Sequence, residues 1–170
     1  DSVLLYHGGY FKKFLTGKLE DKAMVDITAE KATFPKFTMS QGNQVYINLF
    51  KDIEFYGGFN LSGSKVIGTA SDDGFSRIEI KHNNKLFITF RSSEFVIRPD
   101  RFVSARAATV MYFEDDSLFH PGLNVRYNFS NNELIMSRDD EGIGQSPFFN
   151  TYHRLDMYSG AIYWKLNEDF

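Results

Sequence analysis

The sequence predicts an all-β protein of two packed β-layers arranged as an open, β-solenoid-like stack, with a compact β-sandwich or jelly roll as the alternative. Three observations predict this class. Apolar residues recur with a period of two far more often than with the helical period of 3.6. Turn signals of Gly, Asn, Asp and Pro separate many short apolar segments. The aromatic residues, Phe 18, Tyr 9 and Trp 1, suit the half-buried pleated surface of a sheet.

Length and composition indicate one globular domain. The chain has 170 residues, of which 42% are hydrophobic and 24% charged, and these values exclude a disordered or coiled-coil chain. We expect residues 1–170 to form a single β-rich domain with its own core. Strand-like sequence reaches both termini, so we also expect the domain to be a fragment of a longer protein.

Charge and cysteine content exclude several function classes. The net charge is -3 and no long basic segment is present, which argues against nucleic acid as a partner. The absence of cysteine excludes thiol catalysis, disulfides and Cys-based metal sites. No segment approaches the roughly 20 apolar residues of a transmembrane helix.

Residues 26–31 have features of both a helix and a strand. Glu30 would suit the first turn of a helix, but Ile27 and Thr28 are β-branched and fit a strand equally well. Pro35 closes the segment. We predict a strand here.

The clearest element is a hairpin. Residues 77–81 place two isoleucines on one face and charged residues on the other, as a half-buried strand requires. Residues 85–90 form a second strand-like run after the segment His82-Asn83-Asn84. Asparagine tolerates the positive φ of a tight primed turn, so these runs predict two strands joined by such a turn.

A second hairpin is predicted further along the chain. Residues 125–129 and 133–136 flank the segment Ser130-Asn131-Asn132, which repeats the strand, Asn-Asn, strand arrangement. Two further strands are predicted at residues 95–98 and 109–113. A proline ends the first and an acidic turn ends the second.

The spacing of these segments favours a stack. From about residue 51 to residue 138, the chain divides into successive units of roughly twenty residues, a length typical of stacked β-rungs. Each unit ends in a turn and the next begins with a strand. No residue recurs at a fixed position in the units, so an antiparallel meander or jelly roll has the same spacing.

Several segments together resemble one family. They are residues 55–59, 64–68, 95–101, 116–123, 146–149 and 152–158. They are similar to a segment of large β-rich envelope or secreted proteins of Bacteroidetes-type bacteria. The resemblance implies a non-catalytic structural or interaction module in the cell envelope or outside the cell, with neighbouring domains of the same chain as partners. It carries over no site residues.

The alternative function is a glycan- or lipid-binding β-domain. The candidate ligand-contacting aromatic residues are Tyr152, Tyr158, Tyr163 and Trp164, because exposed rings provide platforms for sugars. Aromatic residues at alternating strand positions are more often part of the core. Whether these rings are exposed together therefore distinguishes the two functions.

No pattern predicts an enzyme, a cofactor or a metal site. His120 precedes a Pro-Gly turn, and His153 and Asp156 would point to opposite faces of a strand. The acidic clusters at residues 72–73, 115–116 and 139–142 invite a calcium interpretation, with the last as the densest, but Asp and Gly are ordinary turn residues. We therefore predict no catalytic, cofactor-binding or metal-binding residues.

Overall fold

The computed structural model describes residues 2–70 and 74–166, and within these ranges the protein is all-β, as predicted. Fifteen strands of the described chain form one sheet in which neighbouring strands are antiparallel. In chain order the elements are β1 (Ser2–Leu5), β2 (Leu15–Glu20), β3 (Lys36–Met39), β4 (Val45–Phe50), β5 (Ile53–Ser62), β6 (Lys65–Thr69), β7 (Ser76–His82), β8 (Lys85–Ser92), β9 (Glu94–Arg98), β10 (Arg101–Phe113), β11 (Asp116–Asn128), β12 (Glu133–Ser137), the 3-10 helix η1 (Gly142–Gln145), β13 (Phe148–Asn150), β14 (Leu155–Met157) and β15 (Ala161–Lys165).

The units of roughly twenty residues are successive β-hairpins. They are β5–β6, β7–β8, β9–β10 and β11–β12. Strands of consecutive hairpins pair where β5 meets β7 and where β8 meets β10, and the pairing of β6 with β9 joins the first hairpin to the third. The repeat in the sequence therefore corresponds to stacked hairpins joined edge to edge.

The single sheet folds into two layers because long strands change partners along their length. Residues 53–56 of β5 pair with β4 and β7, whereas residues 58–62 pair with β6 and residues 60–62 also pair with β3. Likewise, residues 101–103 of β10 pair with β9 and residues 108–111 pair with β8. We call the layer that contains β4, β7, β8 and β13 layer A, and the layer that contains β3, β6, β9, β12 and β15 layer B.

The bends in these strands have local causes. In β5 the bend falls at Gly57, where a Cβ atom would lie 2.7 Å from Ser76 Cβ and 2.9 Å from the Thr69 carbonyl oxygen. Only glycine allows the neighbouring strands to approach so closely. In β10 the pairing register shifts between Ser104 and Ala107, and such irregularities bend a strand.

The core lies between the two layers. Phe55 of β5 meets Phe95 of β9 with ring centroids 6.4 Å apart, and Phe87 of β8 meets Trp164 of β15 at 4.8 Å. Phe55 and Phe95 are fully buried. Burial of a phenylalanine side chain stabilises a fold by about 1.5–3 kcal/mol, so the aromatic-rich composition supplies the packing between layers.

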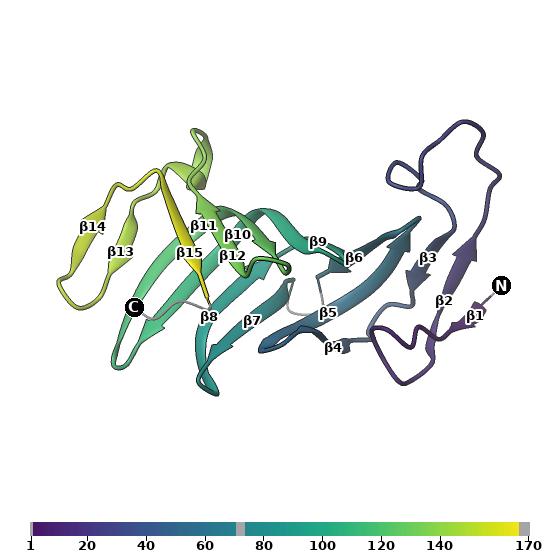
Figure 1. Ribbon diagram of the computed structural model, residues 1–170, viewed down its shortest axis with the longest axis horizontal. Coiled ribbons are helices and arrows are strands. Elements are labelled where there is room, and N and C mark those ends of the chain that lie inside the picture. The colour runs from purple at the N-terminus through teal and green to yellow at the C-terminus, as the bar shows by residue number, and fades with distance from the viewer. Residues whose placement is uncertain (1, 71–73, 167–170) are drawn as a thin grey trace.

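The stack is open at both ends (Figure 1). Strands β1 to β3 form one end of the elongated molecule, and β13 and β14 form the other. Among the described residues, β1, β4, β14 and β15 each pair with a strand on one side only.

The prediction of a strand at residues 26–31 is wrong. This segment belongs to the loop between β2 and β3, where the amides of Lys31 and Ala32 both donate to the Thr28 carbonyl oxygen at 2.9 and 3.0 Å. Val25 is 79% exposed and Ile27 44% exposed. Because no layer covers these β-branched side chains, local turn bonds determine the conformation instead.

The two Asn-Asn turns differ. Asn83 and Asn84 have φ of 49° and 61°, which confirms the primed turn between β7 and β8. In the second loop the left-handed conformation is adopted by Asn132, with φ of 52°, and not by Asn131. There Asn131 Oδ1 accepts a hydrogen bond from the Glu133 amide at 3.3 Å, so side-chain bonding replaces a second left-handed residue.

Candidate functional site

The outer face of layer B carries a groove of about 730 Å³ across β3, β5, β6, β9 and β10. We call it the layer B groove. Its lining includes four cations, Lys36, Lys65, Arg98 and Arg101, and one acid, Glu94. The rest of the lining is neutral, so the groove has a positive charge although the whole chain has a net charge of -3.

Strand register places the four cations in one row. Arg98 lies directly opposite Arg101. Lys65 begins β6 next to the pair Val66 and Ile97, so the same register brings it opposite Arg98. On the other side, Ser62 lies between Lys65 and Lys36. With strands about 4.8 Å apart, the row spans about 19 Å.

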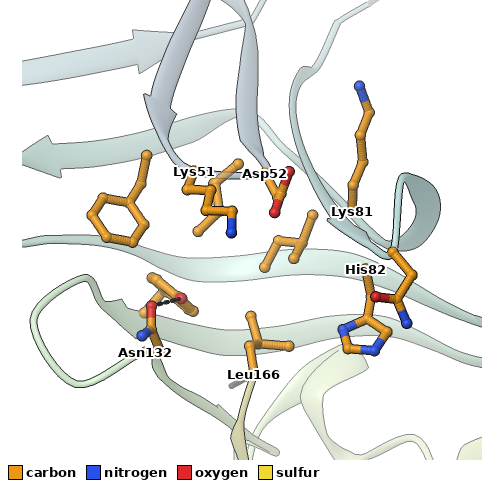
Figure 2. A pocket seen from close by; sticks show the side chains of 11 residues that line it. Lys51, Asp52, Lys81, His82, Asn132 and Leu166 are labelled. Carbon is orange, nitrogen blue, oxygen red and sulfur yellow. Dashed lines mark hydrogen bonds between the residues drawn. The ribbon is translucent and has the colours of Figure 1, made fainter. Parts of the chain in front are cut away.

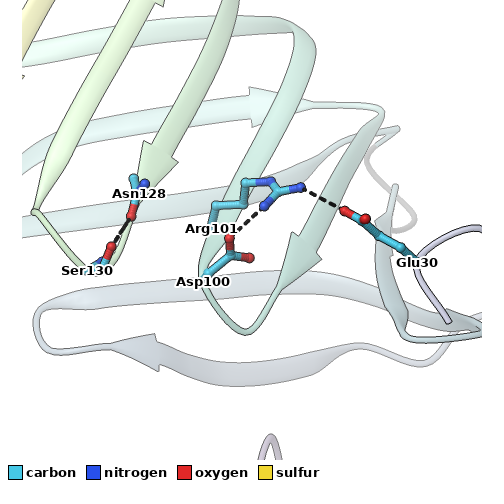
Figure 3. A network of polar contacts seen from close by, with 5 residues as sticks. All are labelled: Glu30, Asp100, Arg101, Asn128 and Ser130. Carbon is cyan, nitrogen blue, oxygen red and sulfur yellow. Dashed lines mark hydrogen bonds and ion pairs between the residues drawn. The ribbon is translucent and has the colours of Figure 1, made fainter. Parts of the chain in front are cut away.

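Acidic residues neutralise one end of this row (Figure 3). Arg101 Nη1 lies 2.6 Å from Asp100 Oδ2, and Arg101 Nη2 lies 3.9 Å from Glu30 Oε1. Glu30 belongs to the loop whose strand prediction is wrong, so that loop reaches over to the end of the groove. Within the described ranges, Lys65 and Arg98 form no ion pair.

The outer face of layer A carries a different cluster, centred on Glu54. Glu54 Oε1 lies 2.7 Å from Lys81 Nζ, and Glu54 Oε2 accepts a hydrogen bond from Tyr56 Oη at 2.9 Å. The Arg77 guanidinium lies 4.6 Å from the centre of the Tyr56 ring and 2.9 Å from Glu79 Oε1. Cross-strand pairing of β5 with β7 brings Glu54 opposite Glu79.

Two carboxylates on facing strands resemble the acid pair of a glycosidase, but the chemistry of this pair is unsuitable. The ion pair with Lys81, together with the tyrosine hydroxyls, holds the pKa of Glu54 below its usual value. A general acid needs a raised pKa instead. Desolvation and the neighbouring Glu54 raise the pKa of Tyr56 to about 12, so Tyr56 stays protonated at neutral pH.

A hollow of about 500 Å³ adjoins the Glu54 cluster. Tyr56, Phe75 and Tyr112 contribute rings to its lining, together with polar residues that include Arg77 and Glu79. Phe75 is 44% and Tyr112 38% exposed. The aromatic surface of layer A is therefore partly accessible to solvent.

A third hollow, of about 420 Å³, lies beside the β4–β5, β7–β8 and β11–β12 turns. Figure 2 shows Lys51 and Asp52 on one side of it and Asn132 and Leu166 on the other. Its lining combines buried apolar groups with polar turn residues, and Tyr127 Oη donates to Asn132 Oδ1 at 3.1 Å. This mixed lining offers no continuous apolar channel for a lipid chain.

His120 has a structural environment. It is buried in β11, where its Nδ1 atom accepts a hydrogen bond from the Gly122 amide at 3.1 Å. Nε2 therefore carries the proton and donates to the Ser146 carbonyl oxygen at 2.9 Å. Burial lowers the pKa of the His120 imidazole, and the ring contacts Phe148 with centroids 4.8 Å apart.

The four predicted aromatic residues do not form one platform. Tyr152, Tyr158 and Tyr163 are 68%, 71% and 70% exposed. Trp164 packs against the core, with Phe87 and Phe113 as neighbours. Adjacent residues of a strand point to opposite faces, so Tyr163 and Trp164 cannot contact the same ligand surface.

The other sequence candidates lie apart. His153 is in the exposed turn between β13 and β14, and the structure shows no hydrogen bond between described His153 and Asp156 side chains. Asp139 of the acidic segment 139–142 accepts a bond from the following amide at 2.7 Å. The cluster at residues 72–73 lies outside the described residues. Across residues 2–70 and 74–166, no group of three or more His, Asp or Glu residues is placed to hold a metal ion.

Comparisons with family models, with curated proteins and with solved structures found no match to this chain. The fold and surfaces therefore define the class by themselves: an open, two-layered antiparallel β-protein with a cationic groove on one outer face. In the described part of the chain, no helix is both long and apolar enough to cross a membrane.

Proposed function

We propose that this chain is a non-catalytic interaction module of a larger bacterial envelope or secreted protein, and that it docks a strand of a neighbouring β-domain onto the edge of β4. The envelope or secreted location is supported by the family resemblance of the sequence. The docking role is supported by β4 itself.

Strand β4 lacks the charge and the proline that usually protect an edge, and its pairing with β5 is irregular between Asn48 and Phe50. Its six residues, Val45–Phe50, include no charged residue and no proline. Among described strands, β4 pairs with β5 alone. Edge strands of monomeric proteins are normally short, charged or interrupted by proline, because their unpaired amides and carbonyls attract other strands. Of the other edges, β14 has three residues and includes Asp156, and β15 ends at Lys165. Strand β1 is also uncharged, but it has only four residues.

The absence of catalysis is supported by the side chains that meet on the surface. The facing carboxylates of Glu54 and Glu79 are each ion-paired. The pKa shifts of Glu54, Tyr56 and His120 all move these groups away from titration near pH 7. General acid–base catalysis requires the opposite tuning.

Sedimentation of the purified chain tests the docking role. Without its natural partner, the β4 edge should pair with β4 of a second copy, and the fraction of dimer should rise with concentration. Tyr46 is 51% exposed, so Tyr46→Lys adds an edge charge without disturbing the core. This variant should stay monomeric, whereas Tyr163→Lys, on the exposed face of β15, should still dimerise. A wild-type chain that remains monomeric up to about 1 mM would contradict the proposal, because 1 mM corresponds to only about 4 kcal/mol of binding free energy.

Ligand binding is the second candidate function, and the layer B groove is the observation that favours it. The groove is larger than the other hollows described above and combines charge with polar groups. The aromatic residues Tyr152, Tyr158, Tyr163 and Trp164 give weaker support, because they do not share one surface.

A further inference from the structure

The row of cations in the layer B groove is the feature that the docking role leaves unexplained. Lys65, Arg98 and Arg101 occupy adjacent strands, although like charges in facing positions repel each other. Two of these residues, Lys65 and Arg98, form no ion pair with any described residue. A fold that retains such a row has a surface complementary to a negatively charged ligand.

The floor of the groove indicates what kind of anion fits. Beside the cations, the lining contains the hydroxyl and amide side chains of Thr38, Asn60, Ser62 and Thr69. Asn60 is held in place because its Oδ1 atom accepts a hydrogen bond from the Met39 amide at 2.9 Å. The apolar part of the lining is half-buried and consists of Leu61, Ile67, Val96 and Val103. Hydroxyl and amide groups next to cations suit a ligand that carries both hydroxyl and acidic groups.

We propose that the layer B groove binds an acidic glycan, with carboxylate or sulfate groups along the row of Lys36, Lys65, Arg98 and Arg101. The row spans about 19 Å, which requires an extended chain rather than a single small anion. Thr38, Asn60 and Ser62 lie beside the row, where they can exchange hydrogen bonds with sugar hydroxyls.

A nucleic acid fits the groove less well. Single-stranded nucleic acids bind on aromatic rings that stack with the bases, and the lining of this groove contains none. Binding of a duplex depends on more phosphate contacts than these four cations provide. A membrane surface is also disfavoured, because the apolar side chains of the lining are half-buried and so offer no protruding apolar group for insertion.

The groove and the β4 edge lie in different layers, so either can fail alone. The first experiment is calorimetric titration of the whole chain at low salt with alginate, which carries carboxylates, and with dextran sulfate. Neutral dextran and a DNA duplex of matched charge are the comparison ligands. We expect binding to at least one acidic glycan, no binding to dextran, and weaker binding to DNA.

A pair of charge-matched variants locates the site. Lys65→Ala with Arg98→Ala should weaken glycan binding at least about tenfold, because both residues lie in the middle of the row. Lys51→Ala with Lys85→Ala removes two exposed lysines outside the groove and should leave affinity unchanged. The melting temperature of each variant shows whether it is folded.

Three results would overturn the proposal. The first is that the wild-type chain binds neither acidic glycan at low salt. The second is that both double variants lose affinity equally, which would indicate a delocalised charge effect. The third is that DNA binds more tightly than the glycans, which would assign the groove to another class of polymer. Retained dimerisation through β4 in any of these cases would leave the docking role intact.

Discussion

Arg98 and Arg101 lie directly opposite each other on β9 and β10, so two guanidinium groups share one face of layer B. The acidic residues Asp100 and Glu30 pair with Arg101. Lys65 lies on the other side of Arg98 in the same register. Such a row is unfavourable for folding, and its presence is more readily explained by a ligand than by stability.

Replacing one cation should therefore stabilise the protein. We expect Arg98→Gln to raise the free energy of unfolding by about 0.2–1 kcal/mol at low ionic strength, because it removes a like-charge contact. The gain should disappear near 1 M NaCl, where the Debye length is about 3 Å. Urea unfolding at both salt concentrations measures it. Arg126→Gln is the control, since Arg126 lies opposite Val103 and Ile135. A loss of stability in Arg98→Gln would contradict the idea that the row is unfavourable.

Gly68 packs so closely against Phe55 that any side chain at position 68 should destabilise the fold. A Cβ at position 68 would lie 2.4 Å from Cε2 of the fully buried Phe55 ring. Gly68→Ala should destabilise the fold by about 1–3 kcal/mol through overpacking. Gly160→Ala, where a Cβ meets nothing within 4 Å, should have little effect. Unfolding by urea compares the two, and a tolerated Gly68→Ala would show that the layers are further apart than described.

Urea unfolding at several pH values tests the ion pair between Glu54 and Lys81. Its hydrogen-bonded contact with Lys81 lowers the pKa of Glu54 in the folded state, so the unfolded chain binds a proton at higher pH than the folded chain. The stabilisation is thus present above the ordinary carboxyl pKa of 4.5 and is lost as the pH falls through the folded value. Glu54→Gln should flatten the loss of stability between pH 5 and about pH 3. Glu141→Gln, in the loop that precedes η1, is the control and should retain the wild-type slope.

Local features of the fold could be predicted from the sequence, because they depend on alternation and turn chemistry. Residues 77–81 and 85–90 fall within β7 and β8, and the Asn83-Asn84 turn joins them. The partner exchange of β5 and β10 could not be predicted. It depends on bends at Gly57 and at the register shift after Ser104, which a period-two pattern does not encode.

The layer B groove could not be predicted from the sequence either. Lys65, Arg98 and Arg101 belong to two different hairpins, and no basic run marks them in the chain. Strand register alone brings them together. By contrast, the separation of Tyr163 from Trp164 follows from alternation, because neighbouring residues of a strand face opposite ways. Sequence reasoning thus places a side chain on one face of a strand but does not identify its neighbours on that face.

The buried imidazole of His120 should give a second dependence of stability on pH, in a higher pH range than that of Glu54. Burial lowers the pKa of His120, and protonation of Nδ1 would break its bond with the Gly122 amide. As the pH falls through the ordinary value of 6.5, the unfolded chain takes up a proton first, so stability should decrease from pH 6.5 downwards until the folded imidazole titrates. His120→Gln should remove this slope and cost about 1–3 kcal/mol at pH 7, because the Gly122 amide and Ser146 carbonyl lose a partner. His153→Gln, in an exposed turn, should retain both the slope and the stability. Nitrogen-15 NMR provides an independent measurement: the neutral His120 ring should carry its proton on Nε2, and a neutral ring with its proton on Nδ1 would contradict the assignment.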